Sequence, residues 1–280
     1  MRIKAGFTIA FITDVPTPVT ALLNVHPSRN RDLLTPQRVE VSPHVALYEY
    51  RDVFGNTATR LTMPAGRTTL QSEFVIEDSG LPDERAPDVP VTPVADLPED
   101  ALQFLLPSRY CETDLLSQFA WNMFGSINSA RDRVEAIVDW VHNHITFGYH
   151  FARNTRTAHQ GFQERVGVCR DFAHLAVTLC RAVNVPARYC TGYLGDIGVP
   201  PVDAPMDFSA WFEVYVDGNW YTYDARHNHP RIGRILMARG RDATDVAITT
   251  TFGLSTLAQF EVVTEEVCEP QMPTLLRTAA

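Results

Sequence analysis

The chain has 280 residues, of which 45% are hydrophobic and 20% are charged, and its net charge is −9. This length is enough for one large or two ordinary domains with a stable core. Nucleic acids and acidic membrane surfaces bind proteins through basic surfaces, so the acidic balance argues against both as partners. No apolar run approaches the roughly 18 residues that a membrane-spanning helix needs.

The cysteines are five in number, lie far apart and include no CxxC pair. This usage is typical of reduced thiols, so we expect a cytoplasmic protein without a disulfide framework. The HxxxH spacing of common zinc sites is also absent, and His227-Asn228-His229 alone is a weak ligand pattern. We therefore expect no metal and no cofactor. The oligomeric state does not follow from the sequence.

The N-terminal segment MRIKAGFTIAFIT contains a short apolar run. We expect a strand here rather than a secretory signal, because Phe7, Ile9 and Phe11 alternate with other residues. Further alternating segments follow, separated by turn residues and without a helical period. We therefore predict a small all-β sandwich over residues 1–80, with strands within Arg38–Val41, Val45–Tyr50, Thr57–Met63 and Thr69–Glu77.

Residues 81–107 contain repeated prolines with acidic residues between them, which predicts a stiff, extended connector. A second domain is expected over residues 108–270. A loose tail is expected over residues 271–280.

The second domain begins with helical patterns. One covers Asp114–Phe124, and Ser129 is placed to cap the next. Strand patterns follow, the last of them over Glu261–Cys268. Helices followed by strands predict an α+β domain.

Cys169 falls where a loop passes into a buried helix. Gly167 lets the chain turn, and the apolar positions of the helix recur at spacings of three and four residues. These positions are Phe172, Ala176, Leu179 and Val183. The first N–H groups of a helix have no acceptor within it, and the helix dipole adds positive charge there, so a thiolate is favoured. Cys169 is thus a candidate nucleophile; the alternative is a small apolar residue of the core.

The stretch SAWFEVYVDGNWYTYDAR alternates apolar and polar residues around Asp217-Gly218, which is a strong signal for a hairpin. Counting back from this two-residue loop sets Ser209 opposite Arg226, and leaves Ser209 and Asp224 on one face. Diagonal neighbours across an antiparallel pair are about 7–8 Å apart. Asp224 is therefore placed to orient the residue at position 209.

These segments together resemble the transglutaminase-like superfamily, a branch of the papain-like cysteine enzymes. The similarity covers residues 108–260 and extends, through Tyr50–Asn56, to the N-terminal β domain of many bacterial members. The matching segments are GVCRDFA at 167–173, CRAVNVPAR at 180–188, TGY at 191–193, AWFEVY at 210–215 and WYTYD at 220–224. The resemblance implies a papain-like core in which the nucleophile begins a helix that packs on an antiparallel sheet.

In this superfamily a cysteine is the nucleophile, a histidine two residues before the tryptophan is the base, and an aspartate ending the next strand orients that histidine. By this resemblance Cys169 is the nucleophile and Asp224 the orienting carboxylate, whereas Ser209 occupies the histidine position. A serine hydroxyl is a poor base near neutral pH. Either the chemistry has been lost, or another histidine serves as the base, or Cys169 acts through the helix terminus alone.

His227 is the candidate for a replacement base, because it lies three residues after Asp224. On a straight strand it would point to the opposite face, so it can assist only where the chain has already turned. Arginines are frequent from Arg226 to Arg241. They suggest an anion-binding site, although arginines more often brace loops.

The sequence therefore predicts a cysteine-dependent acyl-transfer protein that hydrolyses a peptide bond or a glutamine side chain through a thioester on Cys169. Its partner would be a peptide or protein substrate, and hydrolysis is expected rather than crosslinking. The alternative is a catalytically inactive or weak protein of the same fold. Such a protein would bind a peptide or protein partner in the retained cleft, with Ser209 marking the loss.

Overall fold

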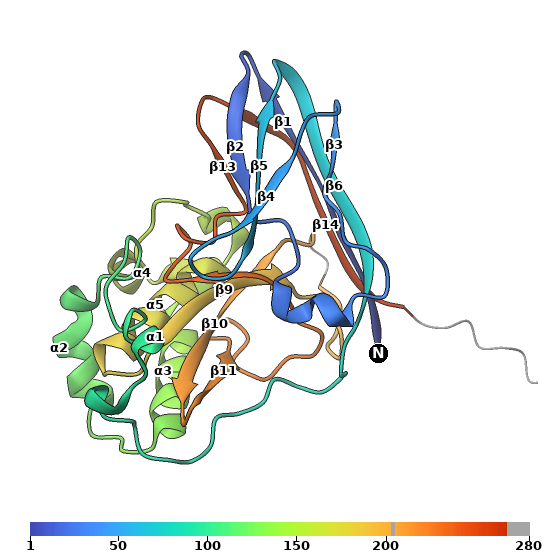
Figure 1. The fold of residues 1–280 in the computed structure, drawn as a ribbon. Coiled ribbons are helices and arrows are strands. Elements are labelled where there is room, and N and C mark those ends of the chain that lie inside the picture. The colour runs from blue at the N-terminus through green and yellow to red at the C-terminus, as the bar shows by residue number, and fades with distance from the viewer. Residues whose placement is uncertain (203–204, 268–280) are drawn as a thin grey trace, which may run out of the picture.

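The computed structural model describes residues 1–202 and 205–267. Its elements form two regions (Figure 1). One, here called the β region, consists of two antiparallel sheets, and the other, the α+β region, has helices beside a third sheet. This combination of helices and sheets confirms the predicted α+β class.

The β region contains two four-stranded sheets, with strand orders β14-β1-β6-β3 and β13-β2-β5-β4. Its strands are β1 (Arg2–Thr13), β2 (Thr17–Ala21), β3 (Glu40–Ser42), β4 (Tyr48–Arg51), β5 (Thr57–Met63), β6 (Gly66–Glu77), β13 (Thr249–Thr251) and β14 (Thr256–Glu266). Strand β1 confirms the prediction for the N-terminal segment.

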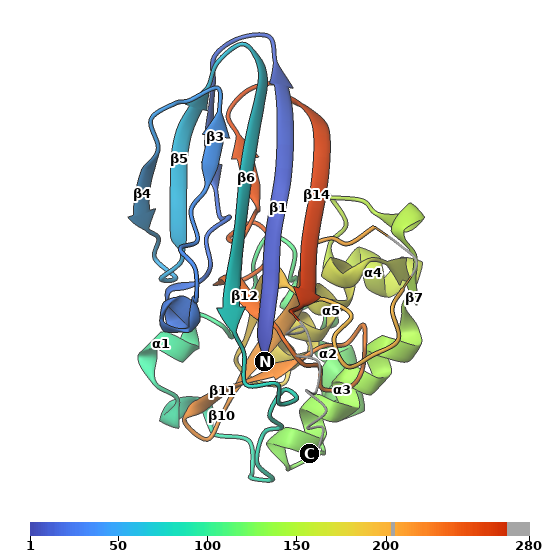
Figure 2. The ribbon, with the colours of Figure 1, turned by 90° about the vertical axis from the view of Figure 1, so that its right-hand side faces the viewer.

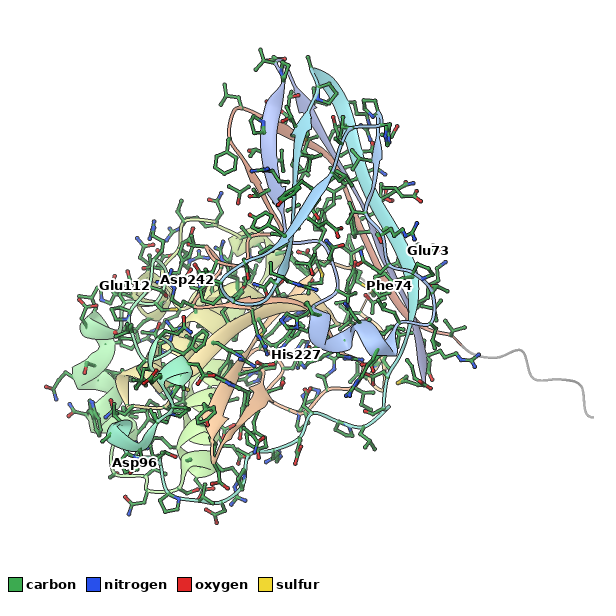
Figure 3. The ribbon with its side chains drawn as sticks, viewed as in Figure 1. Glu73, Phe74, Asp96, Glu112, His227 and Asp242 are labelled. Atoms are coloured by element: carbon green, nitrogen blue, oxygen red, sulfur yellow. The ribbon has the colours of Figure 1, made fainter. Side chains whose placement is uncertain are left out.

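One apolar cluster lies between these two sheets. Ile9 of β1, Val19 of β2 and Leu61 of β5 all belong to it. In β6 the exposed Glu73 and the buried Phe74 point to opposite faces, as alternation requires (Figure 3). Because both sheets contribute to the cluster, they face each other as two layers, and the sheet that contains β14, β1 and β6 faces the viewer in Figure 2.

The last two strands, β13 and β14, belong to the β region, whereas the sequence predicts a second domain that continues to residue 270. Strand β14 pairs with β1 over nearly its whole length, and β13 pairs with β2. The predicted boundary is therefore corrected: residues 249–266 complete the two N-terminal sheets. Alternation is a local pattern, and it does not reveal which distant strand is the partner. The predicted tail at 271–280 lies outside the described residues.

The α+β region contains a four-stranded antiparallel sheet of order β11-β10-β9-β12. Its strands are β9 (Ala187–Tyr193), β10 (Ser209–Val216), β11 (Asn219–Tyr223) and β12 (Ile235–Gly240). Its helices are α1 (Glu99–Leu102), α2 (Thr113–Phe124), α3 (Ala130–His144), α4 (Ala158–Glu164) and α5 (Cys169–Ala182). Two short strands, β7 (Thr146–Phe147) and β8 (Val166–Gly167), pair in parallel just before α5.

Short 3-10 helices complete the described elements: η1 (Pro27–Asp32), η2 (Val94–Asp96) and η3 (Tyr149–Phe151). The predicted connector is extended in part, but it also contains η2 and α1. Ser129 caps α3 as predicted, since its hydroxyl accepts the N–H of Asp132 at 3.2 Å.

Helix α5 is enclosed at the centre of the α+β region. Every residue from Asp171 to Ala182 is buried, and the helix contacts α2, α3 and α4 as well as β9 and β10. The predicted apolar positions all lie in the main apolar cluster: Phe172, Ala176, Leu179 and Val183. Because the helix is enclosed, its first residue, Cys169, has a fixed place relative to the sheet.

The two regions share part of their core. Tyr193, Ile235 and Met237 come from the third sheet but lie in the apolar cluster of the β region. Arg29 of η1 donates to the carbonyl of Arg234 at 2.8 Å. The β region is therefore attached directly to the sheet that carries the site.

Gly192 of β9 occupies a position where no side chain fits. A Cβ there would lie 2.0 Å from the carbonyl oxygen of Ile235 and 2.9 Å from the ring of Trp211. We expect Gly192→Ala to lower the free energy of unfolding by about 1–3 kcal/mol, because the backbone of β12 must move. Thermal denaturation measures the change. Gly161→Ala in α4 is the control, since its Cβ meets nothing closer than 3.8 Å; equal effects of both changes would contradict this reasoning.

Candidate active site

Cys169 is the first residue of α5 and lies on the wall of a cleft of about 950 Å³. The predicted helix start is thereby confirmed. Tyr110 and Arg170 line the same cleft, together with Ser209 of β10 and Phe260 of β14. The cleft therefore receives side chains from both regions, and the structure brings the predicted residues Cys169 and Ser209 together.

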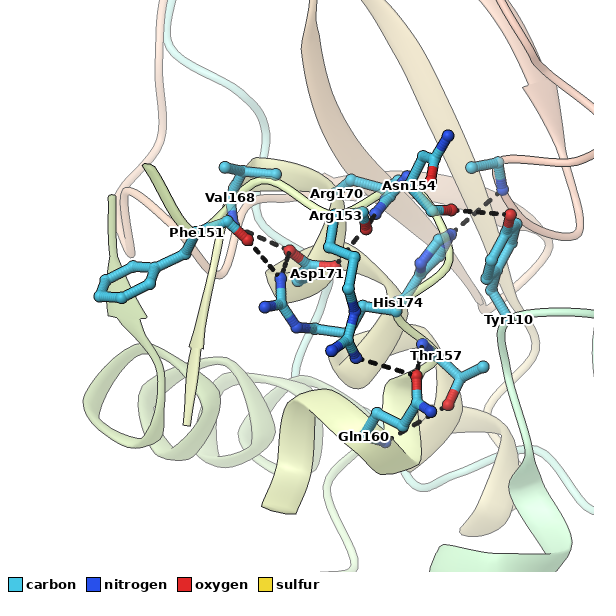
Figure 4. A network of polar contacts seen from close by, with 12 residues as sticks. Tyr110, Phe151, Arg153, Asn154, Thr157, Gln160, Val168, Arg170, Asp171 and His174 are labelled. Carbon is cyan, nitrogen blue, oxygen red and sulfur yellow. Dashed lines mark hydrogen bonds and ion pairs between the residues drawn. The ribbon is translucent and has the colours of Figure 1, made fainter. Parts of the chain in front are cut away.

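A buried ion pair fixes the backbone next to Cys169 (Figure 4). The Asp171 carboxylate accepts the N–H of Val168 at 2.9 Å and binds the Nη1 of Arg156 at 3.0 Å. The side chains of Asp171 and Arg156 are 1% and 5% exposed. Arg156 also donates to the carbonyl of Phe151 at 2.8 Å. The loop before α4 is thus attached to the first turn of α5.

Stacked rings support the cleft wall at Tyr110. The Tyr110 ring lies 5.1 Å from that of His174, and its hydroxyl donates to the carbonyl of Asn154 at 2.9 Å (Figure 4). The Nε2 of His174 accepts the N–H of Ala243 at 3.1 Å, and burial lowers the pKa of His174 to about 3. His174 is therefore a neutral packing residue behind the cleft wall that Tyr110 forms.

The ionisation of Cys169 differs from the expectation. Burial raises the pKa of its thiol to about 11, and the carboxylates of Asp207 and Asp224 act in the same direction. Arg226 and a hydrogen bond from the backbone of Ala210 oppose this shift without cancelling it. Desolvation by the surrounding residues therefore opposes the thiolate that the helix start favours.

The hairpin of β10 and β11 has the predicted loop. Asp217 and Gly218 adopt positive φ angles of 46° and 82°, which suit a two-residue turn. The register follows the prediction, but pairing ends at Tyr223, so the predicted pair of Ser209 with Arg226 does not form. The strand ends here because the chain turns at the next residue.

Asp224 makes this turn. Its Oδ1 accepts the N–H of Arg226 at 3.0 Å and that of His227 at 3.1 Å, and its carbonyl accepts the N–H of Asn228 at 2.8 Å. The turn brings His227 back toward Asp224, so that its Nδ1 lies 2.8 Å from the Asp224 Oδ2. This turn meets the condition set out for His227, which can assist at the site only where the chain has already turned.

Arg234 completes the surroundings of the Asp224 carboxylate. Its Nη2 lies 2.9 Å from Asp224, and its Nε lies 2.8 Å from Asp83. Burial alone would raise the pKa of Asp224, but Arg234 and His227 together hold it well below its usual range. An ionised carboxylate at Nδ1 favours the tautomer of His227 in which Nε2 is free to accept a proton.

Ser209 is buried and borders two cavities. One is the cleft of Cys169. The other, of about 290 Å³, is also lined by Asp207, Arg226 and His227. Among the residues that the structure describes, no histidine lines the Cys169 cleft. Ser209 is therefore the predicted site residue that connects the cavity of the thiol with the cavity of the imidazole.

Some groups at the site were not predicted from the sequence. An acidic residue in the first turn of a helix is favoured by the helix dipole, and this signal could have identified Asp171. Arg156 and Asp207 gave no such signal, because they come from other loops and their spacing matches no motif. Their positions follow only from the fold.

Within the described ranges, no cluster of three or more histidine, cysteine or acidic side chains is arranged to hold a metal ion. In the same part of the chain, no helix has both the length and the apolar character needed to cross a bilayer.

Comparison with known proteins gives concordant matches. Residues 117–225 match the family model of the transglutaminase-like superfamily. The crystal structure of a candidate cysteine protease from Cytophaga hutchinsonii superposes with a TM-score of 0.81 at 30% identity, covering 98% of this chain and 93% of that one.

Two mycobacterial proteins are also similar. An uncharacterised protein of Mycobacterium leprae is 26% identical, with 82% of this chain and 86% of the relative aligned. An uncharacterised protein of Mycobacterium tuberculosis is 28% identical, with 70% of this chain and 68% of the relative aligned. These similarities extend over most of both chains.

The raised pKa of Cys169, about 11, predicts slow alkylation near neutral pH. Near neutral pH the thiol form would therefore dominate. We expect labelling by iodoacetamide, followed by peptide mass spectrometry, to accelerate about tenfold per pH unit up to about pH 10. The buried Cys111, Cys180 and Cys190 should remain unlabelled and serve as internal controls. Rapid labelling of Cys169 at about pH 6 would show that its thiolate is stabilised after all.

Proposed function

Because this chain belongs to the transglutaminase-like superfamily, we propose that it is a cysteine-dependent hydrolase of amide bonds in polypeptides. The observation that carries the proposal is the position of Cys169, which begins an enclosed helix and opens into a cleft of about 950 Å³. A cleft of this size can receive an extended polypeptide segment. The reactive amide would be a peptide bond or the side chain of a glutamine.

In the proposed reaction the Cys169 sulfur attacks the carbonyl carbon, the C–N bond breaks, and the amine leaves with a proton. The N–H of Cys169 belongs to the first turn of α5, so it has no helical acceptor and is available to the developing oxyanion. Water then hydrolyses the thioester, which releases the carboxylic acid and restores the thiol. Hydrolysis needs no second binding site for an amine, and we therefore propose it rather than crosslinking.

The proton of the thiol needs an acceptor, and in this proposal His227 accepts it through Ser209. The Asp224 carboxylate holds the Nδ1 of His227, which leaves Nε2 available. A serine hydroxyl both donates and accepts, so Ser209 can pass a proton between the two cavities that it borders. A relay is less effective than direct contact between an imidazole and a thiol. The raised pKa of Cys169 is consistent with a slow reaction.

The proposed partner is a peptide or protein substrate, and the proposed compartment is the cytoplasm. The four cysteines of the described chain are all free. Thiols remain reduced in the cytoplasm, which suits a reaction that depends on one of them.

A second function is favoured by two observations at the cleft. The pKa of Cys169 is raised, and the described wall of its cleft contains no histidine. In this alternative the cleft binds a peptide or protein partner without turnover, and Ser209 marks the lost base. The two functions differ in the effect of Cys169→Ala, which abolishes hydrolysis but leaves simple binding intact.

The change Ser209→His tests whether the site lacks only a direct base. Cavities on both sides of Ser209 give an imidazole room. We expect turnover of a casein-derived peptide pool to rise about 10²-fold, because the imidazole can take the proton of Cys169 directly. Alkylation of Cys169 should shift to lower pH in the same variant. Ser209→Thr, which keeps a hydroxyl, is the matched control and should stay near the wild-type rate.

If the proton of Cys169 reaches His227 through Ser209, loss of the His227 imidazole should slow the reaction. His227→Gln should lower wild-type turnover, but it should have little effect when combined with Ser209→His, because the relay is then bypassed. An unchanged wild-type rate in His227→Gln would exclude His227 as the base. If neither wild type nor Ser209→His shows turnover, the binding function replaces the hydrolase.

A further inference from the structure

The cavity walls around Cys169 carry more positive than negative side chains, although the chain is acidic overall. Lysine and arginine number 24 against 33 acidic residues in the whole sequence. The charged residues other than histidine on the two cavities that meet at Ser209 are Arg153, Arg170, Asp196, Asp207, Arg226 and Arg231. These cavities therefore reverse the charge balance of the chain.

Arg170 directly follows Cys169 and is incompletely paired. Its only ion pair among the described residues is with Asp171 at 3.5 Å, and that carboxylate has a nearer partner in Arg156 at 3.0 Å. Arg170 also donates to the carbonyl of Arg153, but its Nε is buried without a partner. The guanidinium lies 5.7 Å from the centre of the Tyr110 ring, which also lines the cleft.

Arg226 makes no ion pair within the described chain. Its guanidinium lies 4.0 Å from the centre of the Phe147 ring. An arginine stacked on an aromatic ring keeps the N–H edge of its guanidinium free for a carboxylate. Its charge favours the ionised forms of both Cys169 and Asp207, so it acts close to the reactive sulfur.

Arg231 lies deeper in the wall of the cavity that contains His227. It is 5% exposed, and its Nη2 donates to the carbonyl of Gly195 at 2.9 Å. Its Nε is buried without a hydrogen-bond partner. The carboxylates of Asp224 and Asp196 already act on this charge, so Arg231 contributes positive potential to the cavity without offering a free binding edge.

We propose that the substrate is an acidic polypeptide segment, with carboxylate side chains beside the reactive amide that pair with Arg170 and Arg226. This inference rests on the proposed function for the position of the amide at Cys169. Arginine binds a carboxylate through two parallel N–H···O bonds, which fixes position as well as charge. The wall of the Cys169 cleft also includes the apolar residues Val246 and Phe260.

The negative charge of the whole chain does not prevent this recognition. Exposed charges more than about 10 Å apart are largely screened at physiological salt. The arginines act at contact distance, where the screening is weak. Their placement on the cavity walls therefore decides which segment binds, whereas the net charge of −9 affects only the approach.

Binding can be measured without chemistry in the Cys169→Ala variant. The ligands are fluorescein-labelled peptides of alanine and glycine with a central glutamine. Three versions carry glutamate, glutamine or lysine, respectively, at the positions that flank this central glutamine. We expect the glutamate peptide to bind about tenfold more tightly than the glutamine peptide in fluorescence anisotropy, with the lysine peptide weakest. Added salt should reduce the preference.

The arginines are then changed one at a time in the same background. Arg170→Gln and Arg226→Gln should each reduce the preference for glutamate severalfold while leaving the glutamine peptide unchanged. Arg226→Lys should retain part of the preference, because it keeps the charge. Arg131→Gln is the control, since Arg131 lies on α3 and pairs with Asp88 at 3.3 Å; it should alter neither affinity.

Equal affinities for the glutamate and glutamine peptides would overturn the proposal. An equal loss for both peptides in Arg226→Gln would also overturn it, because that result indicates a structural role. Turnover is measured separately with the wild-type chain. Hydrolysis without preference for glutamate refutes the acidic substrate alone, whereas tight binding of the glutamate peptide without hydrolysis refutes the hydrolase alone.

Discussion

The enclosure of helix α5 is the constraint on which the site depends. Its residues from Asp171 to Ala182 are buried against three helices and two strands, so its first turn cannot shift without disturbing the core. Asp171 adds a local constraint by holding both Val168 and Arg156. Cys169 is half-buried, and the neighbours that this packing places around its thiol raise its pKa. The fixed position of the sulfur and its weak ionisation therefore have one cause.

The polar side of the site is organised by Asp224 rather than by the residue at position 209. Its carboxylate binds the backbone and the ring of His227 and the guanidinium of Arg234. The imidazole that this carboxylate orients is therefore that of His227, which lies in the cavity behind Ser209. The β region contributes as well, since Phe260 of β14 closes part of the cleft. The site thus depends on three separate parts of the chain, namely helix α5, the turn at Asp224 and strand β14.

Patterns within a few residues of the sequence predict several helices, strands and turns of this chain. The features that they do not predict depend on contacts between residues that are far apart in the sequence. The helix at Cys169, the strand β1 and the loop at Asp217 all follow from spacing within a few residues, and the structure confirms them. The pairing of β14 with β1 joins the two ends of the described chain, which no local pattern encodes. The raised pKa of Cys169 has a related origin. The helix dipole is a local property, whereas desolvation depends on every neighbour that the fold supplies.

The most direct test is whether Cys169 carries an acyl group during turnover. The p-nitrophenyl ester of a short glutamate-containing peptide is mixed with the wild-type chain, the reaction is stopped by rapid acidification, and the protein is analysed by mass spectrometry. We expect a mass increase equal to the acyl group on the peptide that contains Cys169, reversed by hydroxylamine and absent from Cys169→Ala. Hydrolysis of the ester without acylation of Cys169, or acylation of Ser209 in its place, would contradict the proposed chemistry.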